Sequence, residues 1–192
     1  MNICSDFIST RIHLRELRHE DVTERYLSWF RDADVTRFLE VRDLKYEEVI
    51  EYMDYGRKTG TYFMYAICVS ENDLHIGNLK VGPLSKKHGV SDMITVIGDK
   101  AFWGQGLATE AIKLGVTVAF DVHRMRKLSA SMYSNNTGSL KAYLNAGWVE
   151  EARLKSHGII EGKLVDGVYV ACFNPEFEGK HCSYGNSHCH RR

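Results

Sequence analysis

The chain of 192 residues has little that would divide it into parts or anchor it in a membrane. It contains only two prolines, Pro83 and Pro175, and no linker rich in serine, glycine and proline. No apolar run approaches the roughly 20 residues that a helix needs to cross a bilayer. Residues 1–10 lack the basic stretch and apolar block of a secretory signal. We therefore expect one soluble domain in the cytoplasm, with no membrane partner.

An excess of charge is also missing. The 25 Lys and Arg residues balance the 25 Asp and Glu residues, so the net charge is zero with histidine neutral. Proteins that grip nucleic acid through its phosphates are normally basic, so we expect no nucleic-acid partner.

Cysteine is sparse and odd in number. Of the five cysteines, Cys68 and Cys172 lie in apolar, strand-like runs and are expected to be buried thiols. Close metal-ligand spacing occurs only near the C-terminus, at His181, Cys182, His188, Cys189 and His190. That segment has no apolar periodicity, so we expect residues 176–192 to form a disordered tail after a domain of residues 1–175. No metal is expected.

Apolar residues recur with a helical period in some segments and alternate, as in strands, in others. Strand patterns cover residues 11–15, 62–69, 74–81, 93–98, 127–132, 148–153 and 166–173. Helical patterns cover residues 20–31, 45–57, 107–120 and 136–145, and Gly147 stands where a glycine commonly ends a helix. This order predicts an α/β domain built around one central sheet.

The strongest local signal is a strand, a glycine turn and a helix within residues 93–120. Gly104 and Gly106 lack Cβ atoms, so the backbone there can turn sharply and approach a ligand. The first N–H groups of the following helix are unpaired and lie at its positive end, which suits phosphate or pyrophosphate. The spacing is neither that of a Walker A loop nor that of a dinucleotide fold, and a structural turn is the alternative.

Two segments carry a resemblance to a known family. Residues 97–111, IGDKAFWGQGLATEA, resemble the acetyl-CoA-binding motif of the GCN5-related N-acetyltransferases (GNATs), especially their RimJ/RimL-type branch. Asn136, Ser139, Tyr143 and the following Gly-Trp pair resemble the family's second motif, with Trp148 in place of the usual Phe. The resemblance implies a single mixed, mostly antiparallel central sheet flanked by helices.

The resemblance also implies the residues that hold acetyl-CoA, the expected cosubstrate. The strand edge at Val96, Ile97 and Gly98 would hold the pantetheine arm and the thioester oxygen. Asn136 and Ser139 would orient the arm, and Tyr143 would protonate the departing thiolate. The pyrophosphate would bind the backbone of Trp103, Gly104, Gln105, Gly106, Leu107, Ala108 and Thr109. Trp103 replaces the Gln or Arg of the general family pattern.

The general base is less clear from the sequence. Asp92 precedes the expected cosubstrate strand, and Glu40 follows the first helical region, where the family places acceptor-side residues. Deprotonation through water is the alternative. A cluster of cations at Arg124, Arg126, Lys127 and Lys141 could meet the 3′-phosphate of coenzyme A or form a solvated basic surface.

These features predict an N-acetyltransferase that moves acetyl directly to a primary amine in a ternary complex. The favoured acceptor is an amino sugar carried on a nucleotide, followed by a protein N-terminus, as in RimJ and RimL, and then a polyamine. The expected partner is therefore a small-molecule or peptide amine, and a homodimer is left open. A non-catalytic acyl-CoA-binding domain is the alternative from a different class.

Overall fold

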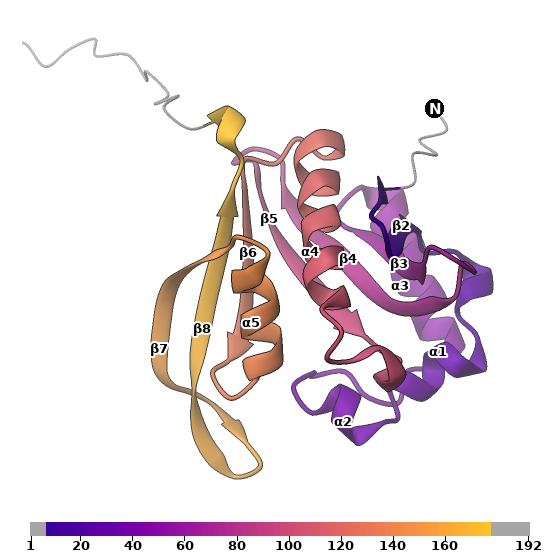
Figure 1. The fold of residues 1–192 in the computed structure, drawn as a ribbon, viewed down its shortest axis with the longest axis horizontal. Helices are drawn as coiled ribbons and strands as arrows, with labels where there is room; N and C mark the ends of the chain where they lie inside the picture. The colour runs from indigo at the N-terminus through magenta and orange to yellow at the C-terminus, as the bar shows by residue number, and fades with distance from the viewer. Residues whose placement is uncertain (1–6, 178–192) are drawn as a thin grey trace, which may run out of the picture.

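An eight-stranded sheet forms the centre of the computed structural model, which describes residues 7–177 (Figure 1). Its strand order is β1-β2-β3-β4-β5-β6-β8-β7. All neighbouring strands are antiparallel except β5 and β6, which are parallel, and this confirms the predicted mixed, mostly antiparallel sheet. The strands are β1 (Phe7–Ile8), β2 (Ile12–Glu16), β3 (Phe63–Val69), β4 (His75–Ser85), β5 (Val90–Ile97), β6 (Lys127–Tyr133), β7 (Val149–Ile160) and β8 (Lys163–Phe173).

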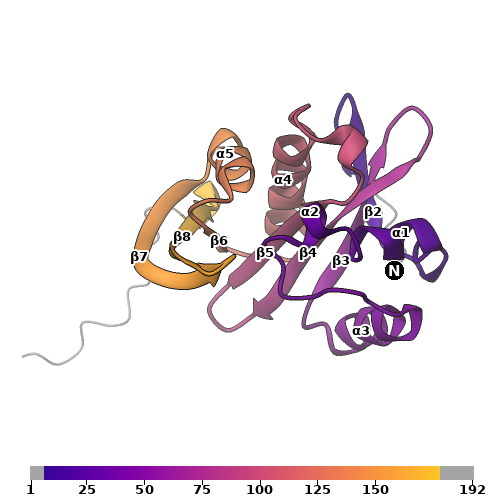
Figure 2. The same ribbon diagram turned by 90° about the horizontal axis from the view of Figure 1, so that it is seen from below.

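Helices cover both faces of the sheet and bury a separate apolar cluster on each (Figure 2). On one face lie α4 (Leu107–Thr117), which continues as a π-helix at Val118–Val122, and α5 (Thr137–Asn145). On the other face lie α1 (Glu24–Trp29), α2 (Ala33–Thr36) and α3 (Tyr46–Thr59). The helices leave β7 uncovered, and its residues are exposed along most of the strand.

The parallel strands β5 and β6 pair over a short stretch only. Their register begins at Val90 and ends with Asp92 opposite Ser129. Beyond this point residues 93–97 stay paired with β4 and residues 130–133 with β8, so the two strands diverge (Figure 1). We call this divergent region, residues 93–97 and 130–133, the splay.

The register of β5 decides which backbone groups face the splay. In an antiparallel pair, alternate residues turn their N–H and C=O groups toward the partner strand. Gly98 N–H donates to the Ile76 carbonyl at 2.9 Å, on the β4 side. The backbone groups of Met93, Thr95 and Ile97 therefore turn away from β4 and into the splay.

Several elements differ from those predicted. The single helix expected over residues 20–31 is divided into a 3-10 helix at His19–Asp21 and α1. The break arises because the Thr23 side chain accepts the Tyr26 N–H and starts a new helix there. The short elements β1 and α2 were not predicted. Their patterns are too brief to show periodicity.

The hairpin of β7 and β8 extends well past the predicted strands. Its tip is Glu161 and Gly162, with φ of 51° and 76°, and two successive positive φ values are typical of a type I′ hairpin turn. The histidines and cysteines of the predicted tail lie outside the described residues. Within residues 7–177, no helix is both long and apolar enough to cross a bilayer.

Candidate active site

A glycine loop, residues 103–106, leads into α4 and leaves the start of that helix bare. Gly104 and Gly106 have φ of 73° and 78°, in the left-handed region that favours glycine. Gly106 is the N-cap and has no side chain to cap the helix, and the Glu110 N–H is the first to reach its carbonyl, at 3.3 Å. The N–H groups of residues 107–109 consequently have no acceptor among residues 7–177. A Cβ added at Gly104 would meet no atom within 4 Å, so this end of the helix is open to an anion.

Arg11, at the start of β2, holds this loop in place. Its Nη1 donates to the Gln105 carbonyl at 2.9 Å, and its Nε donates to Glu110 Oε1 at 2.7 Å. Ser9 Oγ donates to the other Glu110 oxygen, also at 2.9 Å. Sequence reasoning missed this group because its members are far apart in the chain and carry no local motif.

Trp103 fixes the loop from the other side. Its indole N–H donates to the Ile97 carbonyl at 2.8 Å, so the ring folds back over the end of β5. Asp99 accepts the Ala101 N–H at 3.0 Å through Oδ1 and pairs with Arg25 at 2.5 Å through Oδ2. The tryptophan at the family's Gln or Arg position therefore acts here as an anchor of the loop.

The predicted donors on the edge of β5 divide into two groups. Gly98 N–H is already bonded to β4, and Val96 lies opposite Asn78 at a position that also turns toward β4. The N–H groups that face the splay are those of Ile97 and Thr95, so Thr95 replaces Val96 and Gly98 in the expected set. Strand alternation supplies the correction, because only every second residue faces the same edge.

Tyr143 of α5 reaches the splay and is 3% exposed. Its hydroxyl donates to the Met93 carbonyl at 3.0 Å, and its ring meets Trp148 edge to face at 4.8 Å. Burial raises the pKa of Tyr143 to about 12. Trp148 Nε1 is buried and has no hydrogen-bond partner among the described residues, and Thr95 Oγ1 is buried beside the Tyr143 hydroxyl. Buried polar atoms beside a polar backbone edge suit the amide-containing arm of acetyl-CoA.

Asn136 and Ser139 lie at the start of α5. The Asn136 side chain is the N-cap of that helix and accepts the Ser139 N–H at 3.3 Å. This contact starts the helix that carries Tyr143 into the splay. The expected contact of both residues with the cosubstrate stays a prediction.

The two candidate bases occupy different surroundings. Asp92 is the last β5 residue paired with β6, at the apex of the splay. Partial burial raises the pKa of its carboxyl, and Lys80 opposes that shift. Glu40 lies in the loop between α2 and α3, where it is exposed and makes no hydrogen bond or ion pair with any described residue. Asp92 therefore stands at the apex of the splay, and the role of either residue as the base stays a prediction.

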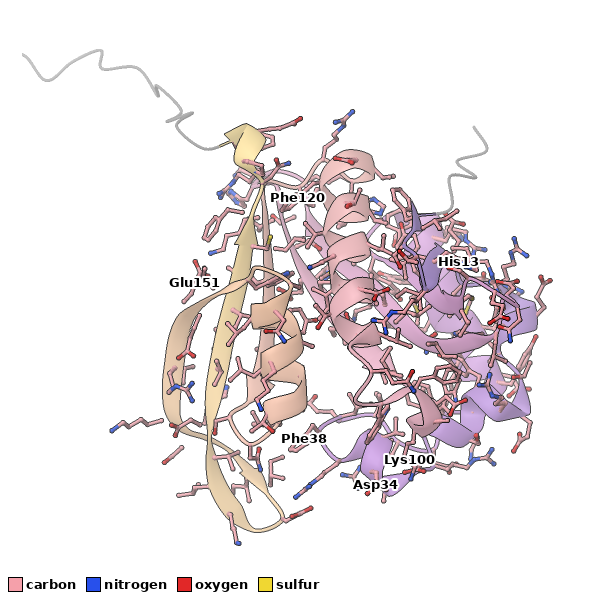
Figure 3. The ribbon with its side chains drawn as sticks, viewed as in Figure 1. His13, Asp34, Phe38, Lys100, Phe120 and Glu151 are labelled. Atoms are coloured by element: carbon pink, nitrogen blue, oxygen red, sulfur yellow. The ribbon has the colours of Figure 1, made fainter. Side chains whose placement is uncertain are left out.

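Ion pairs cross the end at which the strands diverge. Arg37, after α2, pairs with Glu161 at the tip of the β7–β8 hairpin, with Nε to Oε1 at 3.0 Å. Lys100 pairs with Asp32 at 2.7 Å and with Asp34 at 2.9 Å. Figure 3 shows Phe38 and the Lys100–Asp34 pair at this end of the molecule. The Arg37–Glu161 pair therefore joins the segment after α2 to the hairpin tip.

The predicted cation cluster does not assemble beside the glycine loop. Arg124, Arg126 and Lys127 follow the C-terminal end of α4, whereas Gly106 marks its N-terminal end. Arg126 donates to the His88 carbonyl at 2.7 Å, and Lys127 pairs with Glu151 at 2.7 Å. Arg126 and Lys127 thus make contacts within the chain, and the contact of the cluster with the 3′-phosphate stays a prediction.

Comparison with known proteins identifies the family. The model of the acetyltransferase (GNAT) domain matches residues 11–149, which is well over half of the chain. The chain belongs to the GNAT family. An N-acetyltransferase of Bacillus licheniformis, named p20, is 22% identical over 173 residues, covering 88% of this chain and 96% of that protein. A probable N-acetyltransferase of Bacillus subtilis is 26% identical over 132 residues, covering 69% and 72%.

Solved GNAT structures share the fold at low identity. A spermidine N-acetyltransferase from Vibrio cholerae, solved with CoA and spermine, has a TM-score of 0.76 at 16% identity and covers 86% of this chain and 96% of its own. A ribosomal-protein-S5-alanine acetyltransferase from Vibrio fischeri has a TM-score of 0.77 at 15% identity, covering 91% and 99%. The chain is a GNAT N-acetyltransferase whose structural neighbours act on different acceptors.

Proposed function

We propose that this GNAT enzyme transfers the acetyl group of acetyl-CoA directly to a primary amine within a ternary complex. One observation carries the proposal: the outward edge of β5 ends at the bare N-terminus of α4. Three unpaired N–H groups there suit a pyrophosphate, and the Thr95 and Ile97 N–H groups suit the arm and the thioester oxygen. Acetyl-CoA supplies the activated acetyl group.

The reaction needs a neutral amine and a proton for the departing sulfur. The amine nitrogen bonds to the thioester carbon, the carbon–sulfur bond breaks, and the sulfur leaves with the electron pair. Tyr143 is protonated and buried at the splay, so its hydroxyl can turn from the Met93 carbonyl to the sulfur and donate there. Asp92 at the apex takes the proton from the amine, because its raised pKa makes it a better base than an ordinary carboxylate.

The favoured acceptor is an amino sugar carried on a nucleotide. On the strand face that carries Asp92, β6 and β8 present hydroxyl side chains at Ser129, Ser131, Tyr133 and Tyr169. Hydroxyl side chains can donate to and accept from the hydroxyls of a sugar. On that face, Lys80 is the charge next to Asp92, so a polycationic polyamine would meet a cation instead of an acidic cluster.

A panel of amines tests this assignment. Release of free coenzyme A is measured with nucleotide-linked amino sugars, peptides with a free N-terminus and spermidine at equal concentrations. We expect turnover with the amino sugars to exceed that with the other two classes. Preference for peptides would support the second acceptor. Binding of acetyl-CoA without turnover on any amine would indicate a non-catalytic domain.

A further inference from the structure

Three side chains with metal-binding atoms meet on the strands β2 and β3, on the side of the sheet where Figure 3 labels His13. They are His13, Cys68 and Asp73, and their ligating atoms all lie within 4.8 Å of one another. Among residues 7–177 this is the only such group of three or more. None of the three belongs to the glycine loop, the splay or the hairpin.

The fold, rather than a sequence motif, brings these residues together. His13 and Cys68 are directly opposite in the antiparallel register of β2 and β3, so both side chains leave the same face. Asp73 comes from the turn between β3 and β4, where its N–H donates to the Val69 carbonyl at 2.9 Å. This turn brings the Asp73 carboxylate back over the strand pair, and Asp73 Oδ1 lies 3.0 Å from His13 Nε2.

Burial differs in a way that suits a partly enclosed ion. Cys68 is fully buried, the His13 side chain is 14% exposed, and the Asp73 side chain is 61% exposed. The thiol and imidazole would therefore form the inner wall, and the carboxylate would close the solvent side. A fourth position would remain open to water.

The surrounding charges also allow a divalent cation. Arg15 lies nearby, but its Nη1 and Nη2 donate to Asp21 at 2.7 and 2.8 Å, so that guanidinium is already paired. Its Nε approaches Asp73 Oδ1 at 3.4 Å, and His13 Nε2 lies 3.0 Å from the same oxygen. Asp73 Oδ2 makes no hydrogen bond to a nitrogen or oxygen atom among the described residues, and the Cys68 thiol contacts this carboxylate. A metal bound here would take the place of the thiol proton. One thiolate and one carboxylate would balance the two positive charges of the ion.

We propose that His13, Cys68 and Asp73 bind Zn²⁺, with water as the fourth ligand. A thiolate with an imidazole favours Zn²⁺ over Mg²⁺ or Ca²⁺, which take oxygen ligands. Each ligating atom needs to move little, because zinc–ligand bonds of about 2.0–2.3 Å place tetrahedral ligands roughly 3.3–3.8 Å apart. The site ties the β3–β4 turn to β2 and adds to the stability of that edge of the sheet.

Cobalt is the probe for this site, because a thiolate bound to Co²⁺ gives a charge-transfer absorption in the near ultraviolet. The full chain is used with Cys4, Cys182 and Cys189 replaced by serine, which removes the thiols near both ends. We expect one equivalent of Co²⁺ to produce the band and Zn²⁺ to abolish it by displacement. Asp73→Ala and His13→Ala should each weaken Co²⁺ binding by at least about tenfold.

The His19–Asp54 pair provides a matched control. His19 Nε2 lies 2.8 Å from Asp54 Oδ1 without a cysteine beside it, so His19→Ala should leave the Co²⁺ affinity unchanged. Zn²⁺ should raise the melting temperature of the starting chain and not that of Asp73→Ala. The proposal is overturned if no charge-transfer band forms. It is also overturned if Asp73→Ala, a change at an exposed residue, leaves both the band and the affinity intact.

Discussion

Tyr143 already donates its only proton, and the raised pKa keeps that proton in place at neutral pH. We expect Tyr143→Phe to lower kcat by about a hundredfold, which is the usual loss of rate when a general acid is removed. Acetyl-CoA binding should be nearly unchanged. Steady-state kinetics and calorimetric binding measure the two effects separately.

Tyr65→Phe is a suitable control for this change. Tyr65 is also a buried tyrosine, and its hydroxyl pairs with His123 Nε2 at 2.8 Å, on a different part of the sheet. The Tyr65→Phe variant loses a buried hydroxyl at a position outside the splay. Equal losses of kcat in the two variants would mean that Tyr143 supports the fold and takes no part in the chemistry.

The pH dependence of the rate distinguishes Asp92 from Glu40 as the general base. We expect kcat/KM of the starting enzyme to rise with pH as the Asp92 carboxyl loses its proton, above the usual range for aspartate because burial raises its pKa. Asp92→Asn should lower the rate by a factor on the order of a hundred and remove this rise. Glu40→Gln should behave like the starting enzyme. A rise that persists in Asp92→Asn would point to proton removal through water.

At the scale of elements, the glycine loop depends on its attachment to β2 through Arg11. We expect Arg11→Ala to raise KM for acetyl-CoA about tenfold and to change kcat less, since the loop would lose its fixed position while the splay stays intact. Arg18→Ala is the matched control, because within residues 7–177 the Arg18 guanidinium pairs with Glu20 alone, at an exposed position. A fall in kcat at saturating acetyl-CoA, with KM unchanged, would contradict a role in positioning the loop.

The end of the π-helix that follows α4 packs on β3 through a partly buried histidine. His123 stacks on Phe63 at 4.4 Å, and burial, aided by Lys86, lowers its pKa to about 4. Between pH 6.5 and about 4 the unfolded chain therefore binds more protons here than the folded one, and stability falls as the pH falls through this window. The full effect is at most about 3 kcal/mol, since each pKa unit corresponds to about 1.4 kcal/mol.

We expect His123→Gln to show a shallower loss of unfolding free energy across that window. Urea unfolding at pH 6.5, 5.5 and 4.5 measures it. His75, whose pKa burial also lowers, contributes in the same window and is unchanged in the variant. An identical slope in both proteins would mean that the folded and unfolded chains bind a proton at His123 equally.

Periodicity predicted the long elements well because it depends on local sequence. The patterns at residues 45–57 and 107–120 correspond closely to α3 and to α4 with its π-helical end. The β7–β8 hairpin was predicted too short, because β7 is exposed along most of its length and carries no clean alternation. Its Glu161–Gly162 turn was the available signal.

The site was predictable where it is local and not where it is assembled by the fold. Gly104 and Gly106 predict the loop from the sequence alone, because the positive φ at both positions favours glycine. The pairing of Arg11 with Glu110, the early end of the β5–β6 register and the meeting of His13 with Cys68 depend on contacts between distant segments. No pattern within a single segment records them.

At the scale of the whole molecule, the fold brings three features together around the splay. They are the uncapped N-terminus of α4, the edge of β5 that has no neighbouring strand beyond Asp92, and the buried Tyr143 hydroxyl. Solved structures that share this fold are a spermidine N-acetyltransferase and a ribosomal-protein-S5-alanine acetyltransferase. Because the fold is shared while the acceptors differ, we expect the choice of acceptor to depend on the side chains of the Asp92 face and on the α2 and hairpin segments that Arg37 and Glu161 join.

Calorimetric titration of acetyl-CoA into the purified chain is the measurement to make first, with Gly106→Trp as its control. We expect saturable binding of one acetyl-CoA per chain, and much weaker binding by the variant because a large side chain at φ 78° blocks the start of α4. Absence of binding at millimolar acetyl-CoA, with the protein folded, would contradict the acetyl-CoA site and leave the glycine loop as a structural turn.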